Sequence, residues 1–427
     1  MIKILDSAQV PREELFYRGS SGPDQATIDT VKAIIDDVRR RGDAALKEYA
    51  LTFDKVELDE LRVTPEEFNA ARDAAGPKLI EALTKAAENI RAFHSRQLRE
   101  GFRISGNDGY ILGQKITPID KAGIYVPGGT ASYPSTVLMD AIPAKLAGVE
   151  RIIMVTPAGS DGSIAAPILA AASIAGVTDV YKTGGAQAIA ALAYGTESIP
   201  KVDKIVGPGN IYVALAKQQV SSQVGIDMIA GPSEILIVAD KDSDPMRLAA
   251  DMLSQAEHDK LASAVLVCDS MELAHSVQAE LERQLSSLPR QEIAAASINN
   301  NGKIIVASDL SDAIDIANEI APEHIELCMD QPFAWLDKIK NAGSIFLGRF
   351  TPEAVGDYWA GPNHTLPTMG TARFSSPLSV DDFIKKSSFV YFDMHALGKA
   401  KDAIELLARS EGLEAHARSI ASRFEEL

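Results

Sequence analysis

The chain has 427 residues, 46% of them hydrophobic and 24% charged, which is typical of a globular protein with room for two or three domains. Its net charge of −17, from 42 Lys plus Arg against 59 Asp plus Glu, argues against nucleic acid or an anionic membrane as a partner. The longest apolar run, roughly residues 165–177, is too short to span a bilayer, and the N-terminus turns acidic too early for a signal peptide. The two cysteines, Cys268 and Cys328, make no disulfide framework, so we expect a cytoplasmic protein.

The first hundred residues predict helices. Residues 1–20 are mixed and irregular, whereas residues 24–100 carry apolar side chains at a helical period, which would line one face. The residues with this period are Ile28, Val31, Ile34, Ile35 and Val38. Thr64 and Glu67 have the spacing of a capping box, with Pro65 at the first helical position, so a helix is expected to begin there.

From about residue 110 the chain alternates between strands and helices. Short β-branched or apolar runs predict strands at 152–155, 179–183, 234–239, 264–268, 303–307 and 344–348. Most are followed by an Ala-rich or amphipathic helix, and this alternation predicts parallel sheets with crossover helices, an α/β fold. Gly148 and Gly176 end two helices in a faint repeat of the helix-to-strand step, which suits a small doubly wound domain over roughly 125–235.

The C-terminal segment has a different character. From about residue 375 the predicted strands stop, and the end of the chain is interpreted as two amphipathic helices separated at Gly412. A polar tail of this kind has little core of its own. We therefore expect it to dock on another surface, and a partner subunit is one candidate.

Four glycine-containing loops lie within about 110 residues: GIYVPGG (123–129), the Gly-Gly of KTGGAQAIAALA (182–193), VGPGN (206–210) and AGPSE (230–234). The Gly-Gly pair between a strand and a helix would leave free backbone amides at a helix N-terminus, which suits a pyrophosphate. The chain contains no G-x-G-x-x-G fingerprint. Each loop alone is ordinary turn chemistry, but four together favour a bound ligand.

Four of the seven histidines lie in polar segments, where proton transfer or metal binding is more typical than core packing. These segments are 254–259, 321–326, 356–368 and 411–417. The other three, His94, His275 and His395, occupy ordinary helical or apolar surroundings and are interpreted as structural. Gln255 and His258 would share a helix face, which by itself is weak support for a metal site. Asp357 and His364 lie in a Gly/Pro loop, and together with the amide they form a ligand set that suits Zn²⁺.

Glu323 and His324 are adjacent and follow Pro322, which can start a helix, and both side chains could line a cleft if they lie in its first turn. Such a pair could serve two proton transfers or could simply be a solvated helix start. Cys328 is a rival as a thiolate nucleophile, but its apolar neighbours are more typical of a buried, inert cysteine.

Taken together, GIYVPGG, GGAQAIAALAYGT, KIVGPGN, AGPSE, SQAEHD, APEHIEL, GDYWAGPNHTLPT and EGLEAHA resemble the histidinol dehydrogenase family over nearly the whole chain. The resemblance implies a zinc enzyme that oxidises L-histidinol to L-histidine, the last steps of histidine biosynthesis, through a bound aldehyde with two NAD⁺. It also implies a homodimer with the aldehyde-dehydrogenase-like fold: two related α/β domains with parallel sheets, an N-terminal arm, and a helical C-terminal tail that crosses to the other subunit.

The resemblance also implies domain bounds and residue roles. The arm would be 1–20, the larger domain with the metal and catalytic residues 21–124 and 236–377, the smaller cofactor-side domain 125–235, and the tail 378–427. Zinc would be held by Gln255, His258, Asp357 and, from the neighbouring subunit's tail, His416, all of them also near the substrate. Further substrate contacts would be Ser233, His324, His364 and Glu411, the last preferred to Glu414 because of its spacing from the tail histidine. NAD would lie along Tyr125, Gln187 and Asn210, with Glu323 and His324 as the acid/base pair.

Two rival functions are weighed against this one. A relative that oxidises another small primary alcohol is disfavoured because Glu411 and His364 are retained. A zinc hydrolase in which Glu323 activates water could use the same residues, but it would not need the glycine loops at 123–129, 184–187 and 207–210. A non-catalytic binding module explains none of the Glu-His pairing.

Overall fold

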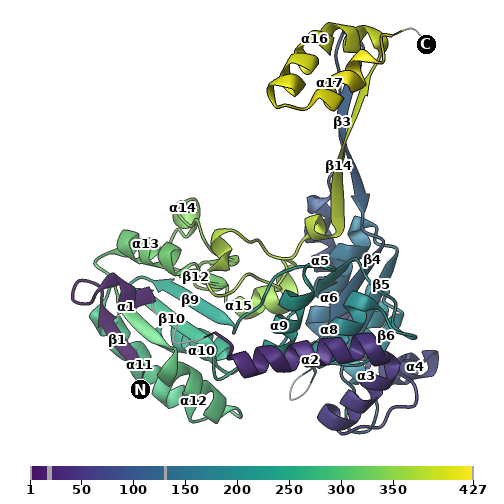
Figure 1. The fold of residues 1–427 in the computed structure, drawn as a ribbon. Helices are drawn as coiled ribbons and strands as arrows, with labels where there is room; N and C mark the ends of the chain where they lie inside the picture. Colours follow the sequence, from purple (N-terminus) through teal and green to yellow (C-terminus); the bar gives the residue numbers. More distant parts are fainter. Residues whose placement is uncertain (1, 17–21, 129–131, 426–427) are drawn as a thin grey trace. The chain divides into compact units, whose positions relative to one another are not determined.

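The computed structural model describes residues 2–16, 22–128 and 132–425. Contacts along the chain divide it into two compact units, Met1–Gln97 with Ile119–Phe383, and Leu98–Pro118 with Ile384–Leu427. The first unit contains two parallel sheets, each covered by helices on both faces (Figure 1). This arrangement confirms the α/β class and the parallel sheets.

One sheet has six parallel strands in the order β1-β11-β10-β9-β12-β13. The strands are β1 (Lys3–Asp6), β9 (Glu234–Ala239), β10 (Ser263–Cys268), β11 (Lys303–Val306), β12 (His324–Cys328) and β13 (Ser344–Leu347). Its helices are α1 (Arg12–Phe16), α10 (Pro245–Ala256), α11 (Met271–Leu285), α12 (Gln291–Asn300), α13 (Leu310–Ile320) and α14 (Phe333–Leu336). Helices α10, α11 and α12 cover one face, and α1, α13 and α14 contribute to the core on the other.

The other sheet has five parallel strands in the order β6-β5-β4-β7-β8. The strands are β4 (Lys121–Tyr125), β5 (Arg151–Thr156), β6 (Asp179–Lys182), β7 (Lys204–Val206) and β8 (Gly225–Ile226). Helices α4 (Pro65–Ala75), α5 (Pro77–His94), α6 (Pro134–Ala147) and α7 (Ala166–Ala175) pack on one face. Helices α2 (Gln25–Arg41), α3 (Asp43–Tyr49), α8 (Gly185–Tyr194) and α9 (Ile211–Val220) pack on the other. The strand order reverses between β4 and β7, which is where doubly wound sheets bind ligands.

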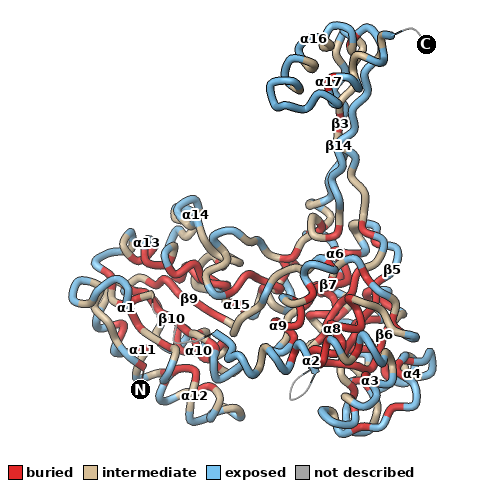
Figure 2. Tube along the Cα trace, viewed as in Figure 1, coloured by how far each residue is buried: buried red, intermediate tan, exposed pale blue. Residues whose placement is uncertain are grey.

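The local signals in the sequence act as expected. The Thr64 hydroxyl accepts from the Glu67 amide at 3.3 Å and the Glu67 carboxylate accepts from the Thr64 amide at 2.8 Å, so the capping box starts α4. Gly148 and Gly176 end α6 and α7 in the left-handed conformation. All six predicted strands are present, and Figure 2 shows that buried residues concentrate in these strands and the helix faces against them.

Two segments pack differently from the expected domain division. The apolar face of α2 lies against α8 and α9 of the five-stranded sheet, and α4 and α5 cover the same sheet, so residues 25–94 do not join the larger domain. Near the N-terminus, β1 pairs with β11 as an edge strand of the six-stranded sheet rather than forming an irregular arm. Periodicity identifies an apolar helix face, but it does not say which sheet that face covers.

The second unit is an antiparallel sheet with two helices. Strands β2 (Phe102–Ser105), β3 (Tyr110–Pro118) and β14 (Ile384–Phe392) pair in the order β14-β3-β2, and α16 (Met394–Ser410) packs on α17 (Glu414–Ala421). The prediction that strands stop after about 375 is wrong, because β14 pairs along the whole of β3. Exposed Phe389, Val390 and Tyr391 in β14 have β-propensity, but they do not alternate with polar residues.

Short helical segments complete the chain: η1 (Ala50–Asp54), η2 (Ser95–Gln97), α15 (Glu353–Val355), η3 (Gly356–Ala360), η4 (Thr371–Arg373) and η5 (Val380–Phe383). Within the described ranges, no helix combines the length and the apolar character needed to cross a bilayer.

Candidate functional site

His324 is the first residue of β12 and Glu323 directly precedes it, so the helix start that Pro322 allows does not form. Ala321 ends α13 with φ of 51°, and the chain then enters β12, where His324 pairs with Ile235 of β9. β-Branched and apolar residues on the neighbouring strands make this a sheet position despite the preceding proline. Both side chains are buried.

The backbone of Glu234, the first residue of β9, holds both catalytic candidates. Its N–H donates to Oε2 of Glu323 at 2.8 Å, and its carbonyl accepts from Nδ1 of His324 at 2.9 Å. Since Nδ1 donates to a carbonyl, Nε2 is the nitrogen that exchanges its proton: it carries the lone pair in the neutral ring and an N–H in the protonated ring. This Nε2 is buried without a hydrogen-bond partner among the described residues, 3.8 Å from Oδ1 of Asp357. The orientation of the ring therefore makes Nε2 the atom at which His324 gains or loses a proton.

Burial and charge perturb both groups. Burial raises the pKa of Glu323 to about 8. Burial opposes protonation of His324, but the charges of Glu323, 3.6 Å away, and of Asp357 outweigh it and raise the pKa of this histidine well above its usual value. A carboxyl that titrates near neutral pH beside an imidazole is suited to proton transfer.

Three of the four predicted metal ligands lie near each other in the first unit. Gln255 is in the last turn of α10 and His258 lies two residues past its end, where its N–H donates to the Gln255 carbonyl at 3.2 Å. Asp357 is in η3, a π-helical turn of the kind often found at functional sites. Burial lowers the pKa of His258, on which the charge of Asp357 also acts.

The donor set fits a divalent metal ion. Burial opposes ionisation of Asp357, but the imidazole of His324 outweighs it and lowers the pKa of Asp357 to about 2. A neutral imidazole, an ionised carboxylate and an amide oxygen are ligands that zinc accepts. Ligand atoms of His324, Glu353 and Asp357 also lie within 4.8 Å of one another. The residues present therefore fit the metal that the resemblance implies.

Two predicted substrate contacts border this cluster. Nδ1 of the half-buried His364 donates to the Asp357 carbonyl and its Nε2 accepts from Oγ1 of Thr136 on α6, both at 3.1 Å, so its tautomer is fixed. Burial lowers its pKa. Ser233 directly precedes β9, next to Glu234. These contacts place His364 beside the metal-ligand loop.

The remaining site predictions lie in the second unit or apart from the cluster. Glu411 caps the C-terminus of α16 and His416 is in α17, and both side chains are exposed. Cys328 is at the far end of β12, and burial raises the pKa of its thiol, so the thiolate-nucleophile alternative has no support from its surroundings.

Tyr125, Gln187 and Asn210, the predicted cofactor contacts, line one cavity of about 880 Å³. Tyr125 ends β4 and Asn210 follows β7, so the cavity lies at the point where the strand order reverses. The N–H of Gly185 donates to the Tyr125 hydroxyl at 3.1 Å at the start of α8. A cavity at strand ends and a helix N-terminus suits a dinucleotide.

A second cavity, of about 590 Å³, is lined by His258 and Asp357. Ser132 lines both cavities, so the metal-ligand side and the cofactor side meet at this residue.

Sequence reasoning missed two buried glutamates. Glu353, in α15, has its pKa raised to about 7 by burial, and Glu326, in β12, has its pKa raised to about 8 by burial and by the charge of Asp251. Only their spacing from predicted site residues could have pointed to them: Glu353 is four residues before Asp357, and Glu326 is two residues after His324.

Known proteins of one family resemble this chain over nearly its whole length. The family model for histidinol dehydrogenase matches residues 18–424. The histidinol dehydrogenase of Geobacillus kaustophilus is 57% identical over 393 residues, 92% of this chain and 93% of that protein. That of Bacillus subtilis is 56% identical over 394 residues, 92% of each chain. The crystal structure of histidinol dehydrogenase from Elizabethkingia anophelis superimposes with a TM-score of 0.94 at 38% identity, covering 99% of this chain and 98% of that one. The chain belongs to the histidinol dehydrogenase family.

Proposed function

We propose that the protein is a zinc-dependent L-histidinol dehydrogenase that oxidises L-histidinol to L-histidine through bound L-histidinal, with two NAD⁺, in the cytoplasm. The observation that carries this proposal is the pair of cavities that share Ser132. One is lined by His258 and Asp357, two of the predicted metal ligands, and the other by the three predicted cofactor residues. A hydrolase would need only the first.

His324 is assigned the first proton transfer. An alcohol loses a hydride only as its hydroxyl proton leaves, so a base must reach the oxygen; Nε2 of His324 has no hydrogen-bond partner among the described residues, and the neutral form of the ring would be this base. NAD, when bound along Tyr125, Gln187 and Asn210, accepts the hydride in each oxidation. The hydroxyl proton goes to Nε2, and the product of this step is the aldehyde.

Glu323 is assigned the second proton transfer. The aldehyde must gain a water molecule before it can lose a second hydride, and a carboxylate beside it can take the proton of that water. The Glu234 amide holds Oε2 of Glu323 in place at 2.8 Å. Two hydrides leave each substrate molecule, so two NADH form.

Gln255, His258 and Asp357 are assigned to zinc, together with His416 of the neighbouring subunit. Zinc, when bound, serves as a template that holds the amine and imidazole of histidinol. Ser233, His364 and Glu411 would contact the substrate around it. The pKa directions at His258 and Asp357 support this assignment, since both favour the metal-binding form.

One experiment tests the function directly. Purified protein is incubated with L-histidinol and NAD⁺, and NADH formed is counted against substrate consumed. Two NADH per histidinol support the proposal, whereas one NADH, with the aldehyde accumulating, contradicts the second oxidation. The variant His258→Asn should lose both bound zinc and activity while its circular dichroism spectrum is unchanged. If it keeps full zinc and turnover, the metal assignment is wrong.

We further propose that two chains form a homodimer in which each tail completes the neighbour's site. The second unit exposes large apolar side chains, which favours docking on another protein surface. They include Val390, Leu406 and Leu407, which are 69%, 70% and 64% exposed. Glu411 and His416 lie in the same unit.

Complementation between two inactive variants tests the crossed tail. In a heterodimer of His258→Asn and His416→Asn, a crossed tail puts both defects in one site and leaves the other intact. Equal mixing with random pairing should therefore restore about a quarter of wild-type activity. If subunit exchange is verified and the mixture stays inactive, each tail serves its own subunit.

A further inference from the structure

Glu353 is a buried carboxylate next to the predicted metal ligands that the assigned roles leave unused. It is the first residue of α15 and is 3% exposed. Its position is fixed from the six-stranded sheet, because its backbone N–H donates to Oε1 of Glu326 on β12 at 2.7 Å. The residue is therefore anchored to the strand that begins with His324.

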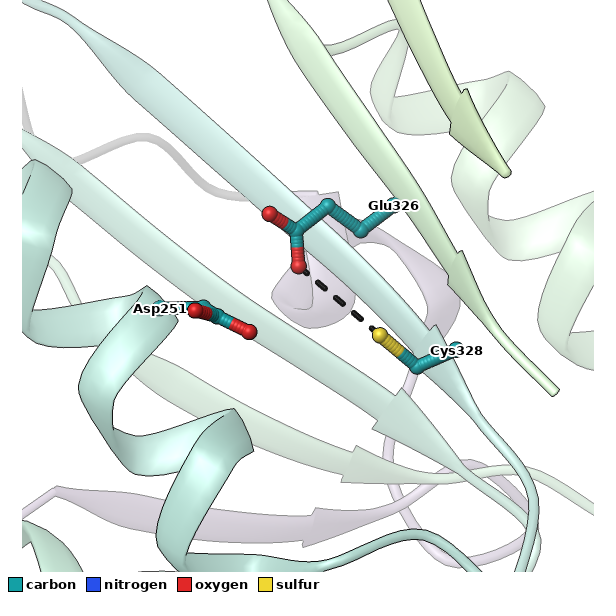
Figure 3. A group of neighbouring side chains, drawn as sticks. All are labelled: Asp251, Glu326 and Cys328. Atoms are coloured by element: carbon teal, nitrogen blue, oxygen red, sulfur yellow. Dashed lines mark hydrogen bonds between the residues drawn. The ribbon is translucent and has the colours of Figure 1, made fainter. Parts of the chain in front are cut away.

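Glu326 is itself held on both oxygens. Figure 3 shows the side chains of Glu326 and Cys328 on the same side of β12, with Asp251 of α10 facing them. The thiol of Cys328 points at Oε2 of Glu326 from 3.8 Å, while Oε1 accepts from the Glu353 amide. This buried arrangement leaves little freedom for the backbone at Glu353.

The Glu353 carboxylate contacts the side-chain amide of Gln255. The ionised Glu353 carboxylate, the form that a nearby metal ion favours, only accepts hydrogen bonds, so the nitrogen end of the amide faces it, and Nε2 of Gln255 donates to both Oε1 and Oε2 at 2.8 Å. The hydroxyl of Ser254 donates to Oε2 at 3.2 Å. With Nε2 held in this way, Oε1 of Gln255 is the atom turned away from Glu353.

We propose that Glu353 is a positioning residue that fixes the amide of Gln255 with its oxygen toward the metal, and thereby sets the affinity for zinc. This inference rests on the proposed zinc site. The two ends of a glutamine amide have nearly the same shape, but only the oxygen is a metal ligand. Without a partner that can only accept a hydrogen bond, and so pairs with Nε2 and not with Oε1, nothing favours the orientation in which the amide oxygen binds the metal.

The substitution Glu353→Gln removes the preference for one orientation of the Gln255 amide and changes the shape of the side chain little. An amide both donates and accepts, so the substituted side chain could pair with either end of the Gln255 amide and draw its oxygen away from the metal. Loss of a partner that orients a metal ligand typically weakens metal binding by about 10- to 100-fold. A loss of that size is expected here.

The test measures the dissociation constant of zinc from the metal-free protein by competition with a chromogenic chelator. Wild type, Glu353→Gln, Gln255→Ala and the double variant are compared. If Glu353 acts through Gln255, the double variant binds zinc no more weakly than Gln255→Ala alone. If the two losses multiply, Glu353 acts independently, as a ligand or a fold-supporting group, and the inference is overturned. Unchanged affinity in Glu353→Gln overturns it as well.

Two further variants separate orientation from charge and folding. Glu257→Gln makes the same charge change two residues from Gln255, and its loss of affinity should be smaller than that of Glu353→Gln. Glu353→Asp keeps an acceptor-only group and should bind zinc more tightly than Glu353→Gln; equal affinities contradict the inference. If the wild type binds no zinc, or if His258→Asn binds it normally, the zinc site itself is wrong. If the wild type binds zinc and His258→Asn does not, but Glu353→Gln binds zinc as tightly as the wild type, the zinc site stands and only the positioning role of Glu353 is wrong.

Discussion

The substitution Lys217→Met removes a buried charge beside the loop that leads to Asn210, one of the residues that line the larger cavity. The side chains of Lys217 and Asp227 are 2% and 1% exposed and form an ion pair. Nζ of Lys217 also donates to the carbonyl of Gly207 at 3.0 Å, in the loop that leads to Asn210. Methionine keeps most of the apolar stem, so the change isolates the charge and this hydrogen bond.

The expected loss of stability follows from the partner that remains. Breaking a buried ion pair from one side costs about 3–5 kcal/mol, since an unpaired charge stays buried. Asp227 keeps two backbone donors, Gly207 N at 2.8 Å and Met228 N at 2.6 Å, so we expect the lower end, about 3 kcal/mol. For cooperative unfolding of 427 residues, an entropy of about 0.9 kcal/mol per kelvin gives a fall in Tm of about 3 K.

Differential scanning calorimetry measures this fall in Tm. The KM for NAD reports whether the loop 206–210 becomes more mobile once the hydrogen bond to the Gly207 carbonyl is lost. A matched control is Lys204→Met, whose partner Asp382 lies 3.0 Å away in a pair that is 16% and 27% exposed, so it should lose only about 0–1 kcal/mol. The double variant Lys217→Met with Asp227→Asn should be more stable than Lys217→Met alone. Equal Tm values for Lys217→Met and the wild type would refute the reasoning.

Three other changes have defined outcomes. Glu323→Gln should slow oxidation of added histidinal by about 10²–10⁴-fold, more than it slows the alcohol step, and equal damage to both half-reactions contradicts the division of roles. Glu326 has a pKa of about 8 when folded, above its ordinary 4.5, so the native state binds the extra proton and loses stability as pH rises between these values. Glu326→Gln does not titrate, so its Tm relative to wild type should increase from about pH 5 to about pH 8.5; a constant difference would mean that Glu326 ionises normally. Cys328→Ala should form NADH at nearly the wild-type rate, because the buried thiol is not a catalytic group. A folded but inactive Cys328→Ala variant would support the nucleophile alternative.

Strands and helix ends could be predicted because their signals are local. Runs such as 234–239 and 303–307 are apolar after their first, charged residue, which is the pattern of a strand buried on both faces, and both form strands in the interior of the six-stranded sheet. Gly148 and Gly176 end helices because their left-handed conformation is available to glycine at no steric cost. Neither inference needs knowledge of distant residues.

The errors concern segments whose structure is decided by distant partners. Pro322 permits a helix start, but pairing of β12 with β9 and β13 makes a strand. Strand β14 exists because β3, more than 260 residues earlier, offers a full edge. The packing of α2 on the five-stranded sheet likewise depends on α8 and α9. None of these partners is encoded by local periodicity.

The candidate site also combines residues that the local sequence reveals with residues whose role depends on distant packing. The segment around His258 and the loop with Asp357 stood out because polar residues gather there, and the structure brings them to one cavity. Glu353 and Glu326 could not be singled out, because an isolated glutamate in a sequence is nearly always exposed. Their burial arises only when α15 packs against β12 and α10.

The two backbone hydrogen bonds by which Glu234 holds Glu323 and His324 have a consequence for protein design. One peptide group on each side of the Cα of Glu234 holds Glu323 and His324, so no side-chain chemistry is required at position 234 to orient the pair. The arrangement is carried by strand alignment, and a shift of β12 by one residue would put Ile325 in the place of His324. A dyad of this kind could be grafted onto a scaffold that presents two parallel strands in the same alignment, with any residue except proline at the receiving position, because the backbone N–H is required there.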